Sequence, residues 1–309
     1  MSEITFLDLP AATLDSLRPG DADVAILGVP HGVAYPNPGL TAGCADAPAA
    51  IRARSRRLAA FVSHHDFDLD GPMLPPGSAL RIADVGDVQG TPDDGAGNAA
   101  RAEGSVRTLL EAGTVPLIFG GDDSIPIPVL RAFASRGPVC VVQVDAHLDY
   151  RDEVAGVRDG YSSTMRRISE MDHVGQVVQV GLRGVGSARP SDVADARAAG
   201  NLLVTARQLR ERGVPWLLGQ LPSQMPIFLL FDIDGLDPSV APAVSGLSPG
   251  GISYEQAADL VTGLAAGHLL VGAAFTELVP ALDATGASAL VVVRLATLLL
   301  GTLARRSEP

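Results

Sequence analysis

Val139–Tyr150, which reads VCVVQVDAHLDY, is the stretch that decides both the fold and the site. It begins with an apolar run typical of a buried strand, and three potential metal ligands follow at alternate positions. Because side chains at i, i+2 and i+4 of an extended chain point to one face, Asp145, His147 and Asp149 would converge on one small volume. Carboxylates buried there without partners would be costly, and a bound cation removes that cost. We therefore predict a metal site at the end of this strand.

A second apolar run, Pro226–Ile233, also leads into acidic residues, Asp232 and Asp234. For one acidic strand end alone, a helix cap or a solvated loop is the simpler interpretation. Two such ends supply four carboxylates and one imidazole. This oxygen-rich set is typical of a site for Mn²⁺ rather than of a cysteine-rich zinc site. Four carboxylates around one ion would carry excess negative charge, so we expect two ions that share bridging carboxylates. Such a centre can hold a hydroxide for hydrolysis at neutral pH.

Apolar strands alternate with helical segments along the rest of the chain. Besides the two runs above, the predicted strands are Asp23–Val29, Leu80–Val85, Val115–Phe119, Gln176–Gly181, Asn201–Val204 and Leu269–Phe275. The predicted helices are Pro48–Ala60, Ala99–Ala112, Pro126–Ala134, Met165–Met171, Ser191–Ala199, Tyr254–Ala266, Ala287–Leu300 and two short segments before Leu221. Continuous apolar strands between helices are typical of a parallel α/β sheet covered on both faces. No linker or repeat divides the chain, so we expect one domain over residues 1–309.

The composition narrows the class of protein. The 309 residues carry a formal net charge of −12, with 35 acidic residues against 23 arginines and no lysine. This balance argues against a nucleic-acid surface and suits a protein that binds cations. The N-terminus lacks the pattern of a signal peptide. Because Arg294 interrupts the apolar stretch 287–300, we expect no membrane span and a soluble, cytoplasmic protein.

Three motifs in this order resemble the signatures of the ureohydrolase family, the arginase and agmatinase group. They are GGDDS at Gly120–Ser124, DAHLD at Asp145–Asp149 and DIDGLDPSVAP at Asp232–Pro242. The resemblance spans about residues 23–300 and is closer to the agmatinase-like branch than to arginase. It implies a three-layer α/β/α sandwich around an eight-stranded, mostly parallel sheet. It also implies two Mn²⁺ ions, with Ni²⁺ in some relatives, and a homotrimer or homohexamer.

The implied activity is hydrolysis of a guanidino compound, such as agmatine or guanidinobutyrate, to urea and an amine by a hydroxide held between the two metals. The motifs assign the metal ligands to Asp123, Asp145, His147, Asp149, Asp232 and Asp234. In the family pattern Asp145 and Asp232 bridge the ions, and Asp149 also passes a proton towards the leaving amine. Glu277 matches the family glutamate that pairs with the substrate guanidinium. The substrate could equally be a guanidino compound other than these two.

The sequence departs from the family at three places. Asp123 stands where relatives carry a metal-binding histidine, so it is either a replacement ligand or the mark of a weakened or empty first site. The segment Arg158–Arg167 lacks the usual histidine and offers Tyr161, Ser162 and Ser163, which we expect beside the substrate; alternatively the segment is a loop whose serines cap the next helix. The third departure, at residues 243–246, would alter the substrate wall. His31 lies in the loop that forms the pocket mouth in relatives.

Two other functions compete with this hypothesis. An inert or partner-dependent homologue would agree with Asp123 and with the missing histidine, but such a protein has no need to keep the remaining ligands. A single-metal amide hydrolase would need a pair of adjacent histidines as its base, and the sequence has no such pair beside the Gly120 loop.

Overall fold

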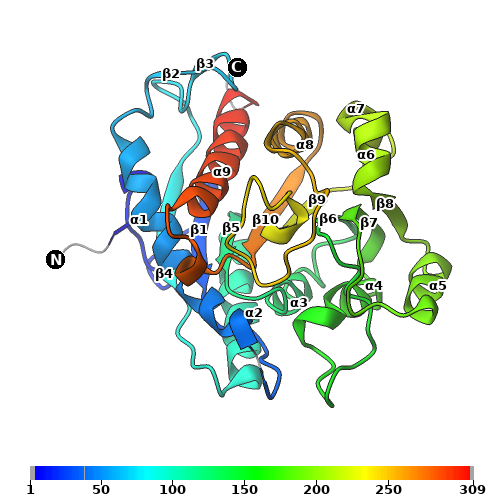
Figure 1. The fold of residues 1–309 in the computed structure, drawn as a ribbon. Helices are drawn as coiled ribbons and strands as arrows, with labels where there is room; N and C mark the ends of the chain where they lie inside the picture. Colours follow the sequence, from blue (N-terminus) through cyan, green and yellow to red (C-terminus); the bar gives the residue numbers. More distant parts are fainter. Residues whose placement is uncertain (1–3, 38, 307–309) are drawn as a thin grey trace.

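The computed structural model describes residues 4–37 and 39–306 (Figure 1). At its centre, eight strands form one sheet in the order β4-β1-β5-β10-β9-β6-β7-β8, and every neighbouring pair is parallel. These strands are β1 (Val24–Val29), β4 (Ile82–Asp87), β5 (Val115–Gly120), β6 (Val139–Val144), β7 (Val174–Leu182), β8 (Leu202–Thr205), β9 (Ile227–Asp232) and β10 (Leu270–Thr276). The predicted eight-stranded parallel sheet is thereby confirmed.

Helices cover both faces of the sheet and complete a three-layer sandwich (Figure 1). One face packs against α1 (Ala47–Ala59), α6 (Ala206–Arg212), α7 (Val214–Leu218), α8 (Tyr254–Gly267) and α9 (Ala287–Arg306). The other face packs against α2 (Gly95–Glu111), α3 (Pro126–Arg131), α4 (Thr164–Ser169) and α5 (Pro190–Ala198). Each face has its own apolar core, as expected of strands that are buried on both sides.

The order of the strands gathers the acidic residues predicted from sequence. β6 and β9 are buried along their whole length and pair directly, with Val144 opposite Phe231. β10 lies on the other side of β9, with Thr276 opposite Asp232, and β5 follows β10. Because parallel strands end at the same edge, the segments after β5, β10, β9 and β6 lie side by side there.

Some predicted boundaries differ from the structure. α2 begins four residues before the predicted helix Ala99–Ala112, because the Asp94 side chain accepts a hydrogen bond from the Gly97 N–H and caps the helix there. No strand was predicted at residues 65–72, where β2 (His65–Asp66) and β3 (Gly71–Pro72) pair in a small antiparallel ladder.

The prediction that no apolar stretch is long enough to cross a membrane was wrong, because the last helix, α9, is longer than predicted. α9 continues past Leu300 to Arg306, and its 20 residues have a mean hydropathy of 2.0 over the most apolar window. By length and composition alone α9 could span a bilayer, but 72% of that window is buried inside the protein. It packs between α1 and α8, so in this fold it acts as a core helix.

Candidate metal centre

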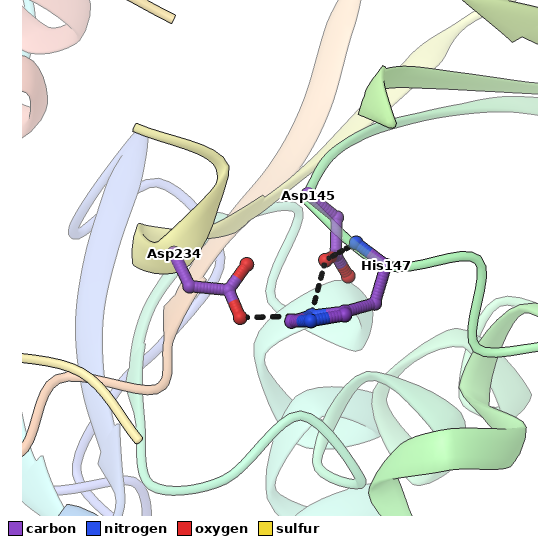
Figure 2. A group of neighbouring side chains, drawn as sticks. All are labelled: Asp145, His147 and Asp234. Carbon is purple, nitrogen blue, oxygen red and sulfur yellow. Dashed lines mark hydrogen bonds and ion pairs between the residues drawn. The ribbon is translucent and has the colours of Figure 1, made fainter. Parts of the chain in front are cut away.

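Two groups of possible metal ligands lie at the edge where the central strands end. One group is Asp145, His147 and Asp234, and the other is Asp123, Asp145 and Asp149; within each group the ligand atoms lie within 4.8 Å of one another. Figure 2 shows the first group, in which Asp145 follows β6 and Asp234 lies on the turn after β9. Asp145 belongs to both groups, which is the arrangement that a bridging carboxylate requires.

Hydrogen bonds within the short turns after β6 and β9 orient these carboxylates. Asp145 accepts the backbone N–H of His147, and Asp232 Oδ1 accepts the N–H of Asp234 at 2.7 Å. Asp234 Oδ1 reaches across to the N–H of Ala146 at 3.1 Å and ties the two turns together. His147 Nδ1 then lies 2.9 Å from Asp234 Oδ2 and 3.5 Å from Asp145 Oδ1 (Figure 2). Among the residues that the structure describes, Asp232 belongs to neither ligand group.

Asp123 is buried in the second group and is held from several sides. Its Oδ1 accepts a hydrogen bond from Thr276 Oγ1 at 2.8 Å, its backbone N–H donates to Glu277 Oε1 at 2.9 Å, and its carbonyl accepts from Thr164 Oγ1. Its Oδ2 is buried and has no hydrogen-bond partner within the described ranges. A buried carboxylate oxygen without a partner is costly, so this atom fits the role of a cation ligand.

Burial makes the charged state of this cluster expensive. It raises the pKa values of three buried carboxyls far above their usual range, and neighbouring carboxylates raise them further; these are Asp123, Asp145 and Asp232. Burial also raises the pKa of Asp149 to about 6. The hydrogen bond to Asp234 raises the pKa of His147 to about 9. A divalent cation would compensate the carboxylates and bind a deprotonated imidazole, so the residues present fit a metal ion.

Glu277 follows β10 and faces the same cluster. Its Oε1 accepts from the Asp123 N–H, and its Oε2 accepts from Ser245 Oγ at 3.0 Å and from Cys44 Sγ at 3.7 Å. Burial and then repulsion from Asp122 raise the pKa of Glu277 to about 8. Glu277 and Asp149 adopt positive φ angles of 67° and 44°, a strained conformation that is concentrated at functional sites.

Sequence reasoning missed Arg183, which follows β7 at the same sheet edge. Its guanidinium donates to backbone carbonyls of the segments that surround the ligand turns, at 2.7–3.0 Å; these are the carbonyls of Gly181, Asp234, Gly235, Leu236 and Ser248. A single arginine after a strand forms no motif. Its position as the first charged side chain beyond β7 was the signal that could have identified it.

The predicted substrate residues lie around the cluster rather than within it. The ring of Tyr161 packs edge-on against Tyr35 at 4.4 Å, and the Ser162 N–H donates to the Tyr35 hydroxyl at 3.1 Å. Ser163 occupies the N-cap position of α4, but its buried hydroxyl makes no capping bond, so the capping interpretation is not supported. His31 lines a cavity of about 380 Å³ that also contacts Asp122, and no member of the two ligand groups lines that cavity.

Comparison with known proteins finds relatives that share the sequence pattern and the fold. A guanidinopropionase of Pseudomonas aeruginosa is 33% identical over 294 residues, which cover 93% of this chain and 87% of that protein. The structure of a proclavaminate amidino hydrolase from Streptomyces clavuligerus matches with a TM-score of 0.85 and 27% identity, over 99% of this chain and 98% of that one. A formiminoglutamase of Trypanosoma cruzi, solved with Mn²⁺, shares the fold with a TM-score of 0.78 and 23% identity, over 95% of this chain and 99% of that one. A sequence profile of the arginase family matches residues 22–301, and the chain therefore belongs to this family.

Proposed function

We propose that this protein is a metal-dependent amidinohydrolase that cleaves a guanidino compound to urea and an amine. The observation that carries the proposal is the pair of ligand groups sharing Asp145 beside the buried carboxylate of Glu277. The names of its relatives, which include guanidinopropionase, guanidinobutyrase and agmatinase, support a guanidino substrate. This function requires two bound cations and one carboxylate free to receive the substrate.

The metal ligands in this proposal follow the family motifs. One ion would be held by Asp123, Asp145, Asp149 and Asp232, and the other by Asp145, His147, Asp232 and Asp234. The Oδ2 of Asp123, which no hydrogen bond from the described residues reaches, supports the role of Asp123 as a ligand in place of the family histidine. Oxygen-rich coordination favours Mn²⁺, with Ni²⁺ as an alternative. When bound, such ions lower the pKa of water and supply a nucleophile at neutral pH.

Glu277 would bind the substrate guanidinium through charge-assisted hydrogen bonds. The Asp123 N–H and the Ser245 hydroxyl fix the orientation of its carboxylate, so the substrate would meet a preorganised acceptor. Asp149 would also pass a proton towards the departing nitrogen, the role that the family pattern gives to this position.

The wall of the substrate site would include Tyr161, Ser162 and Ser163. The buried hydroxyl of Ser163, which has no hydrogen-bond partner among the described residues, and the packing of Tyr161 on Tyr35 support this assignment. His31 would contribute from the loop that lines the neighbouring cavity. These residues would set the choice among guanidino compounds.

Urea release from a panel of guanidino compounds tests the proposal. The enzyme would be loaded with Mn²⁺ and offered 3-guanidinopropionate, 4-guanidinobutyrate, agmatine and arginine. We expect urea from at least one of them, its loss after chelation, its return with Mn²⁺, and its absence in Glu277→Gln. No urea from the whole panel, with both ions bound, would favour an inert or partner-dependent homologue instead.

The assembly and location of the protein remain predictions from the sequence. We propose one domain over residues 1–309 that assembles as a cytoplasmic homotrimer or homohexamer without nucleic-acid or membrane partners. Light scattering of the purified protein gives the oligomer size directly, and a monomer would contradict the proposed assembly.

A further inference from the structure

Two glutamines lie in the sheet core beside the metal centre. Gln143 on β6 and Gln179 on β7 are both fully buried, and they stand opposite each other in the parallel ladder. Amide side chains in a strand core need hydrogen-bond partners, because a buried polar group without one costs about 1–3 kcal/mol. The partners that these glutamines have lead to a metal-ligand candidate.

The two side chains form a hydrogen-bonded chain that ends on Asp145. Gln143 Nε2 donates to Asp145 Oδ2 at 2.7 Å, and Gln179 Nε2 donates to Gln143 Oε1 at 2.8 Å. Gln179 Nε2 also donates to the Leu148 carbonyl at 2.9 Å. Farther out, Asn201 Nδ2 donates to Gln179 Oε1 at 3.4 Å.

The direction of this chain follows from the chemistry at both ends. A carboxylate that binds a metal ion is ionised and only accepts hydrogen bonds, so in the metal-bound state Gln143 turns its NH₂ group towards Asp145 and its carbonyl oxygen towards Gln179. The Leu148 carbonyl is also only an acceptor, and it independently requires the NH₂ group of Gln179 at that position. Along the chain from Asn201 to Asp145, each amide therefore donates a hydrogen bond towards Asp145, an arrangement that fixes the plane of its carboxylate.

We propose that Gln143, supported by Gln179, is a positioning residue that prepares Asp145 to bind metal. This inference rests on the metal centre proposed above. Asp145 is the member common to both ligand groups, so the orientation of its carboxylate affects both ions. Side chains that orient a metal ligand typically change metal affinity about 10- to 100-fold when they are removed.

The test measures Mn²⁺ binding by titration calorimetry on the metal-free full-length chain. Gln143→Met keeps a similar volume and removes both hydrogen bonds, and we expect its Mn²⁺ affinity to fall about 10- to 100-fold. Gln143→Glu places an acceptor against Asp145 and should bind at least as weakly. Gln176→Met is the matched control, because Gln176 lies opposite Cys140 near the start of β7, far along the strand from Asp145. We expect the control to bind like the parent protein.

Gln179→Met provides a second test if Gln143→Met does not fold. It keeps the contact between Gln143 and Asp145 but removes its support, so we expect a loss of Mn²⁺ affinity that is smaller than the loss in Gln143→Met. A purely structural role would lower the melting temperature and leave the Mn²⁺ dissociation constant unchanged. Folded Gln143→Met or Gln179→Met that binds Mn²⁺ like the parent would overturn the inference. A parent protein that binds no Mn²⁺ would instead overturn the metal centre itself, and this inference with it.

Discussion

Replacing Asp123 with asparagine removes one negative charge from the proposed first metal site and almost nothing else. Asparagine has the same shape, and its side-chain oxygen can keep the hydrogen bond from Thr276 Oγ1. The backbone contacts of residue 123 with Glu277 and Thr164 do not depend on its side chain. Asp123→Asn therefore tests the charge and ligand role of this position with little change in packing.

The expected loss of Mn²⁺ affinity follows from the burial of the first metal site. Two unit charges about 4 Å apart interact by about 4 kcal/mol at an effective dielectric constant of about 20, which is a factor of about 1,000 in affinity. The remaining amide oxygen recovers part of this loss, so we expect at least a 100-fold weaker first ion. The second ion has His147 and Asp234 as ligands of its own and should bind as in the parent.

The assay is the number of Mn²⁺ ions per chain after desalting, measured by elemental analysis beside a competition titration. We expect about two ions in the parent and about one in Asp123→Asn. The matched control is Asp93→Asn, which removes the same charge from an exposed residue and should keep both ions. The metal-free variant should also be at least as stable as the metal-free parent, because burial raises the pKa of Asp123 and makes its charged form unfavourable. Two tightly bound ions in Asp123→Asn would refute this assignment.

Three further outcomes follow from the same contacts. Arg183→Leu should lower the free energy of unfolding in urea by about 2–3 kcal/mol and should also weaken Mn²⁺ binding. Arg183→Lys should not restore either property, because one ammonium cannot reach all the carbonyls that the guanidinium binds. Hydrogen bonds from Ser239, Gly250 and Gly251 lower the pKa of Asp237 to about 2, so the stability it adds is complete above about pH 4 and is lost as the pH falls towards 2. Asp237→Asn should therefore flatten acid unfolding in that window and cost about 1 kcal/mol at neutral pH, after allowance for solvent screening; an unchanged acid profile would contradict this. Chelation should lower the melting temperature of the protein. At a Mn²⁺ concentration of 100 times the dissociation constant, binding of one ion adds about 2.7 kcal/mol to the free energy of unfolding. An equal melting temperature with and without chelator would argue against a resident ion.

The sequence predicted the central sheet well because its strands are short apolar runs with little alternation. β6 and β9 are buried throughout, so no competing helical periodicity obscured them. Their acidic ends were also predictable, since parallel strands bring consecutive motifs to one edge. The predicted boundaries of helices were wrong where a single side chain sets them. Asp94, for example, starts α2 inside a glycine-rich stretch that favours a loop.

The residues that support the site could not be predicted in the same way. Arg183 binds backbone carbonyls, which any sequence supplies, so no partner residue marks its role. Gln143 interrupts an apolar run, but its importance depends on Gln179, which is 36 residues away and becomes a neighbour only through the pairing of β6 with β7. Within residues 4–37 and 39–306 the Oδ2 of Asp123 has no hydrogen-bond partner, and only the packed structure can reveal that.

The most direct test of the dimetal centre is an anomalous-scattering map of crystals grown with Mn²⁺. We expect two peaks about 3.5–4 Å apart at the edge where β5, β6, β9 and β10 end. One peak should contact Asp123, and the other should contact His147. A single peak beside His147, with Asp123 turned away from it, would contradict the proposed first site and favour a homologue with one metal or none.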